Sequence, residues 1–291
     1  MKGFVLINAF NKSDAYLNQP SRLKEEFNKR NVELDILKND GVRIYIDGDG
    51  KIVNGYKEYD FCICLDKDEY VSACLEKCGL RLFNSAEAIR VCDDKYRTYI
   101  ALTGSGIDMP TTFCAPLCYT NGSEADENAL KTIARKLGFP MVVKTNYGSL
   151  GASVKLMKNA DELIKYANEE KFTPHIYQKF VKGGEDVRII VIGGKVAAGM
   201  KRINRKDFRS NVELGGVGVK YVPSKDETEI AERAARFLNL DYCGVDVLDD
   251  NGSPVLCEVN SNAFFGGIEK VSGVNVAGAY ADFIIKAMTG K

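Results

Sequence analysis

Two carboxylates and a carboxamide near the end of the chain have the residue types and spacing of a magnesium site. Asp246 stands in one short apolar run, and residues 250–254, DNGSP, form a turn signal before the next run. Glu258 and Asn260 share one face of that second strand, whereas Cys257 lies on the other face, because strand side chains alternate. Oxygen ligands of this kind suit Mg²⁺, which favours one or two carboxylates plus substrate phosphates.

The length of the turn decides where Asp246 points. A two-residue turn would place Asp246 opposite Cys257, away from Glu258. A three-residue loop at residues 251–253 sets Asp246 directly opposite Glu258, with Cβ atoms roughly 4.5 to 5.5 Å apart. It also puts Pro254 first in its strand, where proline is tolerated. We expect the longer loop, although an exposed hairpin with solvated acids also fits this pattern taken alone.

A lysine and a glycine-rich loop form a candidate phosphate site. Lys144 interrupts the apolar strand MVVKT, so it either faces solvent or is a partly buried cation that needs an anion. The loop at residues 146–151, NYGSLG, joins strand to strand, which excludes a Rossmann turn or P-loop. Its amides could nevertheless fold over phosphates, with Ser149 among the loop residues.

A second hairpin gathers charged side chains on one face. The glycines at residues 193–194 form a two-residue turn, which places Asp186 and Arg188 together on the polar face. The same alternation of side chains puts Arg202 on the apolar face or beyond the end of the strand, so Arg202 is the weaker ligand candidate. The basic segment at residues 201–211 fits either a solvated surface or an anion clamp.

Composition narrows the class of protein. The 40 basic and 40 acidic residues cancel, so no net field attracts nucleic acid or an anionic membrane, and we expect neither partner. No apolar run approaches ~18 residues, which indicates a cytoplasmic protein.

Nine cysteines without a CxxC pair indicate reduced thiols. The single His175 argues against a zinc set and a histidine-based triad. The sequence leaves open whether the chain forms a homo-oligomer.

The elements that must position these residues alternate strand and helix up to about residue 88, which predicts a parallel α/β unit. Its polar loop at residues 8–18 lies at a strand's carboxyl end, where such sheets commonly hold ligands. Lys95 falls in a long helical stretch, residues 85–102. Further helices are expected at 124–137, 161–170, 226–238 and 274–288, and further strands at 139–145, 152–157, 175–181, 186–192 and 195–203.

In this order the segments resemble the ATP-grasp superfamily, most closely its RimK-like branch of glutamate and amino-acid ligases. The resemblance runs from about Cys92 to the last residue, in the segments VVKTNYGSLGASV, YQKFVKGGEDVRIIVIGGKVAAGMKRI, DFRSNVELGG and GVDVL…VLCEVNSNAFFGGIEKVSGVNVA. It implies an α/β protein of the α+β ATP-grasp type. That fold would have an N-terminal parallel α/β domain at 1–90, a central lid subdomain at 91–174 and a C-terminal antiparallel-sheet subdomain at 175–291.

The resemblance also implies roles for individual residues. Lys95 and Lys144 would hold ATP phosphates beneath the loop that contains Ser149, with Arg209 and Asn211 nearby. Gln178, Lys179, Phe180 and Val181 would bind and cover the adenine, and Asp186 the ribose. Asp246, Glu258 and Asn260 would bind Mg²⁺, with two ions expected, Glu258 bridging them, and Mn²⁺ as an alternative ion. Arg188 and Arg202 would act on the acyl phosphate.

The family's reaction joins a carboxylate to an amine. The carboxylate attacks the γ-phosphorus of ATP, and the amine then displaces phosphate from the acyl phosphate. Phosphoryl transfer needs positioning and charge neutralisation more than a protein nucleophile, which suits this set of residues. The basic segment near Arg205 favours an acidic amino acid such as glutamate. A dipeptide or D-alanyl ligase and a non-catalytic nucleotide-binding regulator are the alternatives, and the intact D…ExN set argues against the regulator.

Two positions depart from the family pattern. Lys179 stands where relatives often carry an acidic residue, which leaves main-chain contacts as the expected role there. The closing loop, NSNAFFGG, lacks the proline usual in relatives, so Ala263 and Phe264 are expected to shape a different acceptor pocket.

Overall fold

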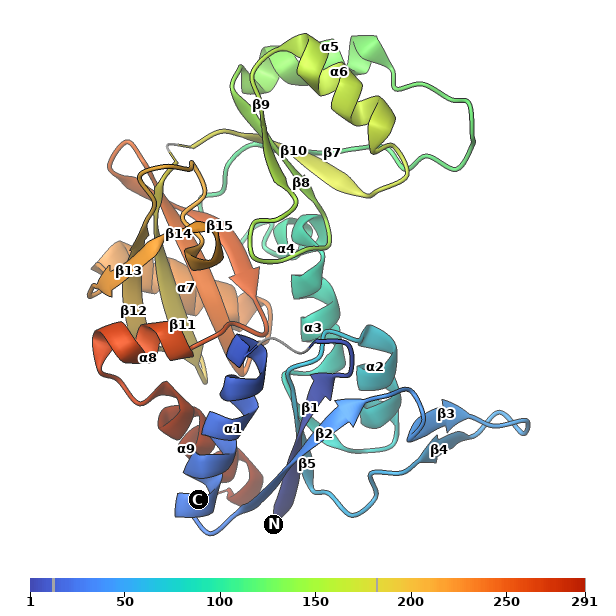
Figure 1. Ribbon diagram of the computed structural model, residues 1–291, viewed down its shortest axis with the longest axis vertical. Helices are drawn as coiled ribbons and strands as arrows, with labels where there is room; N and C mark the ends of the chain where they lie inside the picture. Colours follow the sequence, from blue (N-terminus) through green and yellow to red (C-terminus); the bar gives the residue numbers. More distant parts are fainter. Residues whose placement is uncertain (12–13, 182, 291) are drawn as a thin grey trace.

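A computed structural model describes residues 1–11, 14–181 and 183–290 of the chain. Within these ranges it contains a four-stranded parallel sheet, a four-stranded antiparallel sheet, a five-stranded antiparallel sheet and a two-stranded hairpin (Figure 1). This combination of one parallel sheet with antiparallel sheets confirms the predicted fold class.

The N-terminal unit is the parallel sheet, with strand order β2-β1-β5-β6. Its strands are β1 (Lys2–Asn8), β2 (Glu33–Asn39), β5 (Phe61–Cys64) and β6 (Arg81–Phe83), and the hairpin of β3 (Ile44–Ile46) and β4 (Ile52–Asn54) extends beside it. Helix α2 (Glu69–Lys77) begins where Asp68 accepts hydrogen bonds from two main-chain amides. Helix α1 (Asp14–Lys29) begins inside the polar loop predicted at residues 8–18, so that loop is shorter than expected. Residues 12 and 13 lie outside the described residues.

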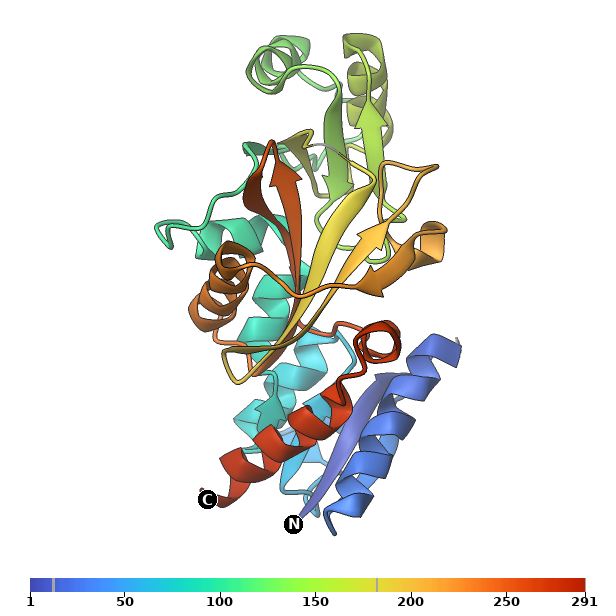
Figure 2. The ribbon, with the colours of Figure 1, turned by 90° about the vertical axis from the view of Figure 1, so that its left-hand side faces the viewer.

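The last helix of the chain packs on this first sheet. Helix α9 (Val276–Thr289) lies beside α1 in both views (Figures 1 and 2). Tyr280 and Ile284 of α9 are buried in the same cluster as Phe27 of α1 and Phe61 of β5. The beginning and the end of the chain therefore share one hydrophobic core.

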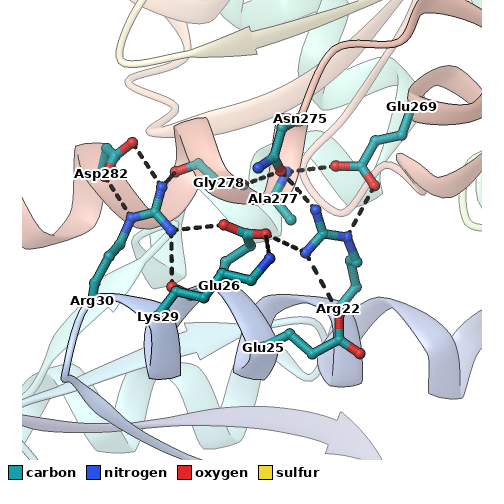
Figure 3. A network of polar contacts seen from close by, with 10 residues as sticks. All are labelled: Arg22, Glu25, Glu26, Lys29, Arg30, Glu269, Asn275, Ala277, Gly278 and Asp282. Atoms are coloured by element: carbon teal, nitrogen blue, oxygen red, sulfur yellow. Dashed lines mark hydrogen bonds and ion pairs between the residues drawn. The ribbon is translucent and has the colours of Figure 1, made fainter.

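A polar network fastens α1 to the elements at the end of the chain (Figure 3). Glu26 of α1 is only 2% exposed. Its carboxylate accepts hydrogen bonds from Arg22, Lys29 and Arg30. Arg30 also binds Asp282 of α9, with Nε to Oδ1 at 2.6 Å, and Arg22 donates to Asn275 at 2.8 Å. The two helices are thus joined by charge as well as by apolar packing.

The central unit has its own core. Its sheet has the order β7-β10-β8-β9, and its elements are β7 (Thr112–Cys114), α5 (Glu127–Leu137), β8 (Met141–Thr145), β9 (Val154–Met157), α6 (Ala160–Glu169) and β10 (His175–Lys179). Leu130, Val143 and Tyr177 are buried together there. The helical stretch predicted before it is two helices, α3 (Ala86–Asp93) and α4 (Lys95–Ala101), because Asp94 caps α4 and interrupts the turn.

The five-stranded sheet has the order β13-β12-β11-β14-β15. Its elements are β11 (Glu185–Ile192), β12 (Lys195–Ile203), the 3₁₀ turn η1 (Val212–Leu214), β13 (Val217–Lys220), α7 (Lys225–Phe237), β14 (Tyr242–Asp250), β15 (Ser253–Asn260) and α8 (Gly266–Ser272). Helix α7 begins at a capping box of Ser224 and Glu227, and Ala231 and Ala234 are buried against one face of the sheet. The opposite face carries the polar side chains described below.

The division into domains at residues 90 and 174 stays a prediction. Strand β10 pairs within the sheet of the central unit, and α9 packs on the N-terminal sheet, although both belong to the predicted third segment. In the portion of the chain that the structure describes, no helix is long and apolar enough to cross a membrane.

Candidate active site

Two adjoining cavities collect the residues singled out from the sequence. The first lies between the central unit and the five-stranded sheet, and we call it the inner cavity. Its lining includes Lys95, Lys144, Ser149, Gln178, Lys179, Phe180, Val181, Asp186, Arg202, Arg209, Asn211, Asp246 and Glu258. Arg188 and Asn260 line the second, larger cavity, which shares Ser149, Arg202, Asn211 and Glu258 with the first. All the candidate residues therefore line one or both of two cavities that share part of their wall.

In the last hairpin Asp246 lies opposite Glu258 as expected, but the loop that joins the two strands is not the expected one. Asn251 and Gly252 form a two-residue turn with φ angles of 56° and 92°, so the predicted three-residue loop is wrong. A β-bulge between Asp246 and Val247 corrects the register, so that Asp246 pairs with Glu258. Bulges insert one extra residue in one strand and thereby re-aim its side chains.

Cys257 is the extra residue of this bulge, and it lies in the inner cavity instead of on the apolar face predicted for it. Its Sγ is 3.7 Å from Nζ of Lys144, which is only 7% exposed. Burial raises the pKa of the Cys257 thiol, so a neutral sulfur faces the ammonium group at neutral pH. Among the described residues Lys144 forms no ion pair, and the Glu258 carboxylate acts on its charge from beyond ion-pair distance.

The second lysine closes the space between the glycine loop and the hairpin. Nζ of Lys95 donates to the carbonyl of Gly148 at 2.9 Å and lies 3.3 Å from Oε1 of Glu258. Gly151 has a φ of +74°, and a Cβ there would stand 2.6 Å from Oδ1 of Asn211. Glycine is therefore required where the loop approaches the basic segment. Nη1 of Arg209 donates to the Gly151 carbonyl at 2.9 Å and holds the loop down.

Four charged side chains form a buried ladder across β12, β11 and β14. Arg202 donates through Nε to Asp186 at 2.7 Å, and its Nη2 lies 2.9 Å from Oδ2 of Asp246. Arg188 donates through Nη2 to Asp246 at 2.7 Å. Burial favours a protonated Asp246, but Arg188 and Arg202 outweigh it and lower the pKa of this carboxyl. Asp246 is therefore an anion at neutral pH.

Arg202 reaches this ladder through a second bulge, so its predicted position on the apolar face is wrong. The turn at residues 193–194 pairs Ile192 with Lys195 as expected, but the register shifts between Ile190 and Val191. Arg202 then pairs with Asp186 and lies on the same face of the sheet as that residue. Lys201, the preceding residue of the strand, lies on the opposite face.

The connection after β10 lines the mouth of the inner cavity. The Gln178 side chain is buried, and its Nε2 donates to Tyr99 at 2.8 Å and to Thr112 at 2.9 Å. Lys179 forms an ion pair of 3.2 Å with Asp250 at the tip of the last hairpin. This ion pair ties the mouth to the hairpin that carries Asp246.

The three predicted metal ligands fit a magnesium ion by their chemistry. Asp246 and Glu258 face each other, and Asn260 lines the larger cavity together with Glu258, so its side-chain oxygen can join them as a ligand. Across residues 1–11, 14–181 and 183–290, no three His, Cys, Asp or Glu side chains are gathered as a metal site. An ion here would need the carboxamide and ligand oxygens to complete its shell, as Mg²⁺ commonly does.

The larger cavity lies between the N-terminal unit and the closing loop after β15. Gln19 and Lys67 line it from the N-terminal unit, and Asn262, Ala263 and Phe264 line it from that loop. This is the place where Ala263 and Phe264 were expected to shape an acceptor pocket. Sequence reasoning did not single out Gln19, Lys67 or Asn262, because no motif marks them.

Residues 92–284 match the RimK-like ATP-grasp domain. Human N-acetylaspartylglutamate synthase A is 34% identical over 231 residues, which are 78% of this chain and 58% of that protein. Human beta-citrylglutamate synthase B is 37% identical over 225 residues, which are 75% of this chain and 56% of that protein. The chain thus spans less than two thirds of these relatives. A probable alpha-L-glutamate ligase of Shewanella loihica is 33% identical over 288 residues, 93% of this chain and 92% of that protein.

Solved structures share the fold at lower identity. D-alanine–D-alanine ligase from Bacillus anthracis, complexed with ATP, has a TM-score of 0.75 at 19% identity, covering 99% of this chain and 97% of that one. A RimK domain ATP-grasp protein from Sphaerobacter thermophilus has a TM-score of 0.71 at 20% identity, covering 98% and 100%. The ATP-grasp ligase PsnB, solved with a minimal precursor, Mg and ADP, has a TM-score of 0.71 at 18% identity, covering 98% and 97%.

Proposed function

This chain belongs to the RimK-like ATP-grasp family, and on that premise we propose that it is an ATP-dependent ligase that joins a carboxylate to an amine. The observation that carries this proposal is the inner cavity, where the buried Lys144 ammonium has no carboxylate within ion-pair distance among the described residues. A buried cation is costly unless it is paired, and the phosphates of ATP supply the missing charge. Lys95 and Arg209, which bind carbonyls of the glycine loop, flank the same phosphates.

The nucleotide occupies the inner cavity. The segment at residues 178–181, which lines this cavity, binds and covers the adenine. Asp186 takes the ribose, and Ser149 and Asn211 close over the phosphates. Asp246, Glu258 and Asn260 would hold Mg²⁺, with two ions, or Mn²⁺ in its place. When bound, the metal neutralises phosphate oxygens as charge develops on them.

The carboxylate substrate lies where the two cavities meet. Arg202 lines both cavities and Arg188 lines the larger one, so their guanidinium groups can orient the acid and then stabilise the acyl phosphate. The acid attacks the γ-phosphorus and releases ADP. The amine enters through the larger cavity and displaces phosphate to leave an amide.

Glutamate is the amine that the relatives favour. The relatives at 33–37% identity are named as synthases of a product whose name ends in glutamate or as a glutamate ligase. The D-alanine–D-alanine ligase resembles this chain in fold at 19% identity, so D-alanyl transfer is the second candidate. Both substrates are small molecules under this proposal.

The test is ADP release in the presence of Mg²⁺. Carboxylic acids, including N-acetylaspartate and citrate, are crossed with a panel of amino acids that contains L-glutamate and D-alanine. We expect ADP formation that needs an acid and an amine together, with the amide detected by mass spectrometry. ADP binding without turnover for any pair would refute the ligase and favour a nucleotide-binding regulator.

A further inference from the structure

The wall of the larger cavity holds buried polar atoms that have nothing to bind. Four buried side-chain atoms lack a hydrogen-bond partner in the described part of the chain, and three of them belong to residues that line this cavity. One is the amide nitrogen of Asn260, which is a donor. The other two, Oε1 of Gln19 and Oδ1 of Asn262, are acceptors. Unpaired buried acceptors are rare in folded proteins and call for an explanation.

The orientation of both amides is fixed by their other ends. Nε2 of Gln19 donates to the main-chain carbonyl of Ala263 at 3.2 Å, and Nδ2 of Asn262 donates to the main-chain carbonyl of Leu65. A flipped amide would set oxygen against oxygen in either case. Two acceptor oxygens, one from α1 and one from the closing loop, therefore have no donor among the described residues.

The loop that carries Asn262 is held firmly in place. The Ala263 carbonyl also accepts a hydrogen bond from the Tyr242 hydroxyl at 2.7 Å. The Ser261 carbonyl accepts one from Asn84 at 2.9 Å. A rigid loop keeps an acceptor in position before a ligand arrives, which is what an orienting group needs.

We propose that Gln19 and Asn262 accept the two N–H bonds of a primary amine, the nucleophile of the ligation. This inference rests on the proposed ligase function. A neutral amine R–NH₂ has two N–H bonds and one lone pair, so two acceptors leave the lone pair free to attack. Carboxamide oxygens carry no net charge, so they orient the amine without stabilising its unreactive ammonium form, as a carboxylate would.

The step balances without a further reactant. The amine nitrogen forms the C–N bond, the C–O bond to phosphate breaks, and phosphate leaves with that electron pair and takes up the proton that the nitrogen gives up. A secondary amine in its neutral form has a single N–H bond, so one of the two acceptors would stay unpaired. The site is therefore specific for primary amines.

The wild-type chain provides the first test, with no substitution required. L-Glutamate is compared with N-methyl-L-glutamate as the amine, with the same acid, ATP and Mg²⁺. We expect kcat/KM to be at least about tenfold lower for the N-methyl compound, as expected when a site built to bond an N–H group loses it. Equal rates for the two amines would overturn the proposal.

Substitutions separate lost hydrogen bonding from a steric clash. Gln19→Met and Asn262→Leu keep side-chain length and remove the acceptor, and each should raise the KM for L-glutamate by about fivefold to tenfold. The KM values for ATP and for the acid should not change. Each substitution should also reduce the preference for L-glutamate over its N-methyl analogue, which a purely steric cause would leave intact.

Tyr242→Phe is the matched control, because it removes the other hydrogen bond to the Ala263 carbonyl but neither free oxygen. Because it loosens the loop but removes neither acceptor, it should keep the preference for L-glutamate over its N-methyl analogue within about twofold of wild type. Unchanged KM values in Gln19→Met and Asn262→Leu, in an enzyme that ligates, would overturn this inference alone. If no acid and amine pair yields ADP with the wild type, the ligase proposal fails and this inference fails with it.

Discussion

Replacing Lys144 by methionine tests whether a buried cation is kept for the nucleotide. The side chain is 7% exposed, and its only hydrogen-bond contact among the described residues is the Cys257 thiol at 3.7 Å. Taking an ammonium out of water costs several kcal/mol when no anion faces it. Lys144→Met keeps the length of the side chain and removes that cost. The free protein should therefore be as stable as wild type, or more stable.

Nucleotide binding should change in the opposite direction. A charged hydrogen bond to phosphate contributes about 1.5 to 3 kcal/mol, which corresponds to a Kd for ADP about 10-fold to 150-fold higher. At an ADP concentration of about 100 times the wild-type Kd, binding stabilises wild type by about 2.7 kcal/mol. A 100-fold weaker variant would gain only about 0.4 kcal/mol. For 291 residues these figures correspond to melting shifts of about 4 °C and under 1 °C.

The assay is thermal unfolding with and without Mg²⁺ and ADP, supported by a calorimetric Kd. Lys155→Met is the matched control, because Lys155 lies on the neighbouring strand β9 opposite Val143, pairs with Glu170 and does not line the inner cavity. Wild-type ADP affinity in Lys144→Met would refute the reasoning. A loss of several kcal/mol of stability without ligand would refute it too, because the lysine would then be a structural cation.

Three further predictions test the neighbouring groups. Asp246→Asn should abolish the Mg²⁺ dependence of ADP binding. It should also lower the free energy of unfolding in urea by about 3 kcal/mol, because Arg188 and Arg202 lose a buried anion. Unchanged Mg²⁺ dependence would remove Asp246 from the metal site. Arg188→Met should lower kcat at least about 100-fold while the Kd for ADP stays the same, because Arg188 lines only the larger cavity; a parallel loss of ADP affinity would contradict this. Hydrogen bonds from Lys29, Arg22 and Arg30 hold the pKa of Glu26 below its usual value of 4.5. Its stabilising contribution is therefore complete above about pH 4.5 and lost as the pH falls towards the lower folded pKa. Glu26→Gln should lower stability at pH 7 and flatten the loss of stability between about pH 5 and pH 3 in urea unfolding; a variant that keeps the wild-type acid dependence would show that another carboxylate governs it.

The positions of the strands, turns and helices could be predicted from the sequence because local signals set them. The glycine pair at residues 193–194 marks the turn between β11 and β12, and the helix expected at 226–238 is found as α7 (Lys225–Phe237). The resemblance to the RimK-like branch added the fold class, which the family match and the solved structures confirm. Roles assigned to single residues stay predictions.

The register inside the two hairpins could not be predicted, because a β-bulge leaves no local signal here. Alternation along β12 placed Arg202 on the apolar face, and the bulge near Ile190 turned it into the site. On the last hairpin the opposition of Asp246 and Glu258 was correctly expected, but from the wrong loop. One extra residue in a strand moves every side chain beyond it to the opposite face of the sheet. Counting alternate residues from the turn therefore gives the wrong face at the far ends of the strands, where these ligands lie.

The docking of α9 on the first sheet has a consequence for synthesis on the ribosome. The sheet of β1, β2, β5 and β6 emerges early, yet Tyr280 and Ile284, which cover it, follow about 200 residues later. At about 5 to 20 residues per second this interval lasts from about 10 to 40 seconds. During that time Phe27 and Phe61 lack part of their apolar cover, and the nascent chain presents a surface that chaperones can recognise.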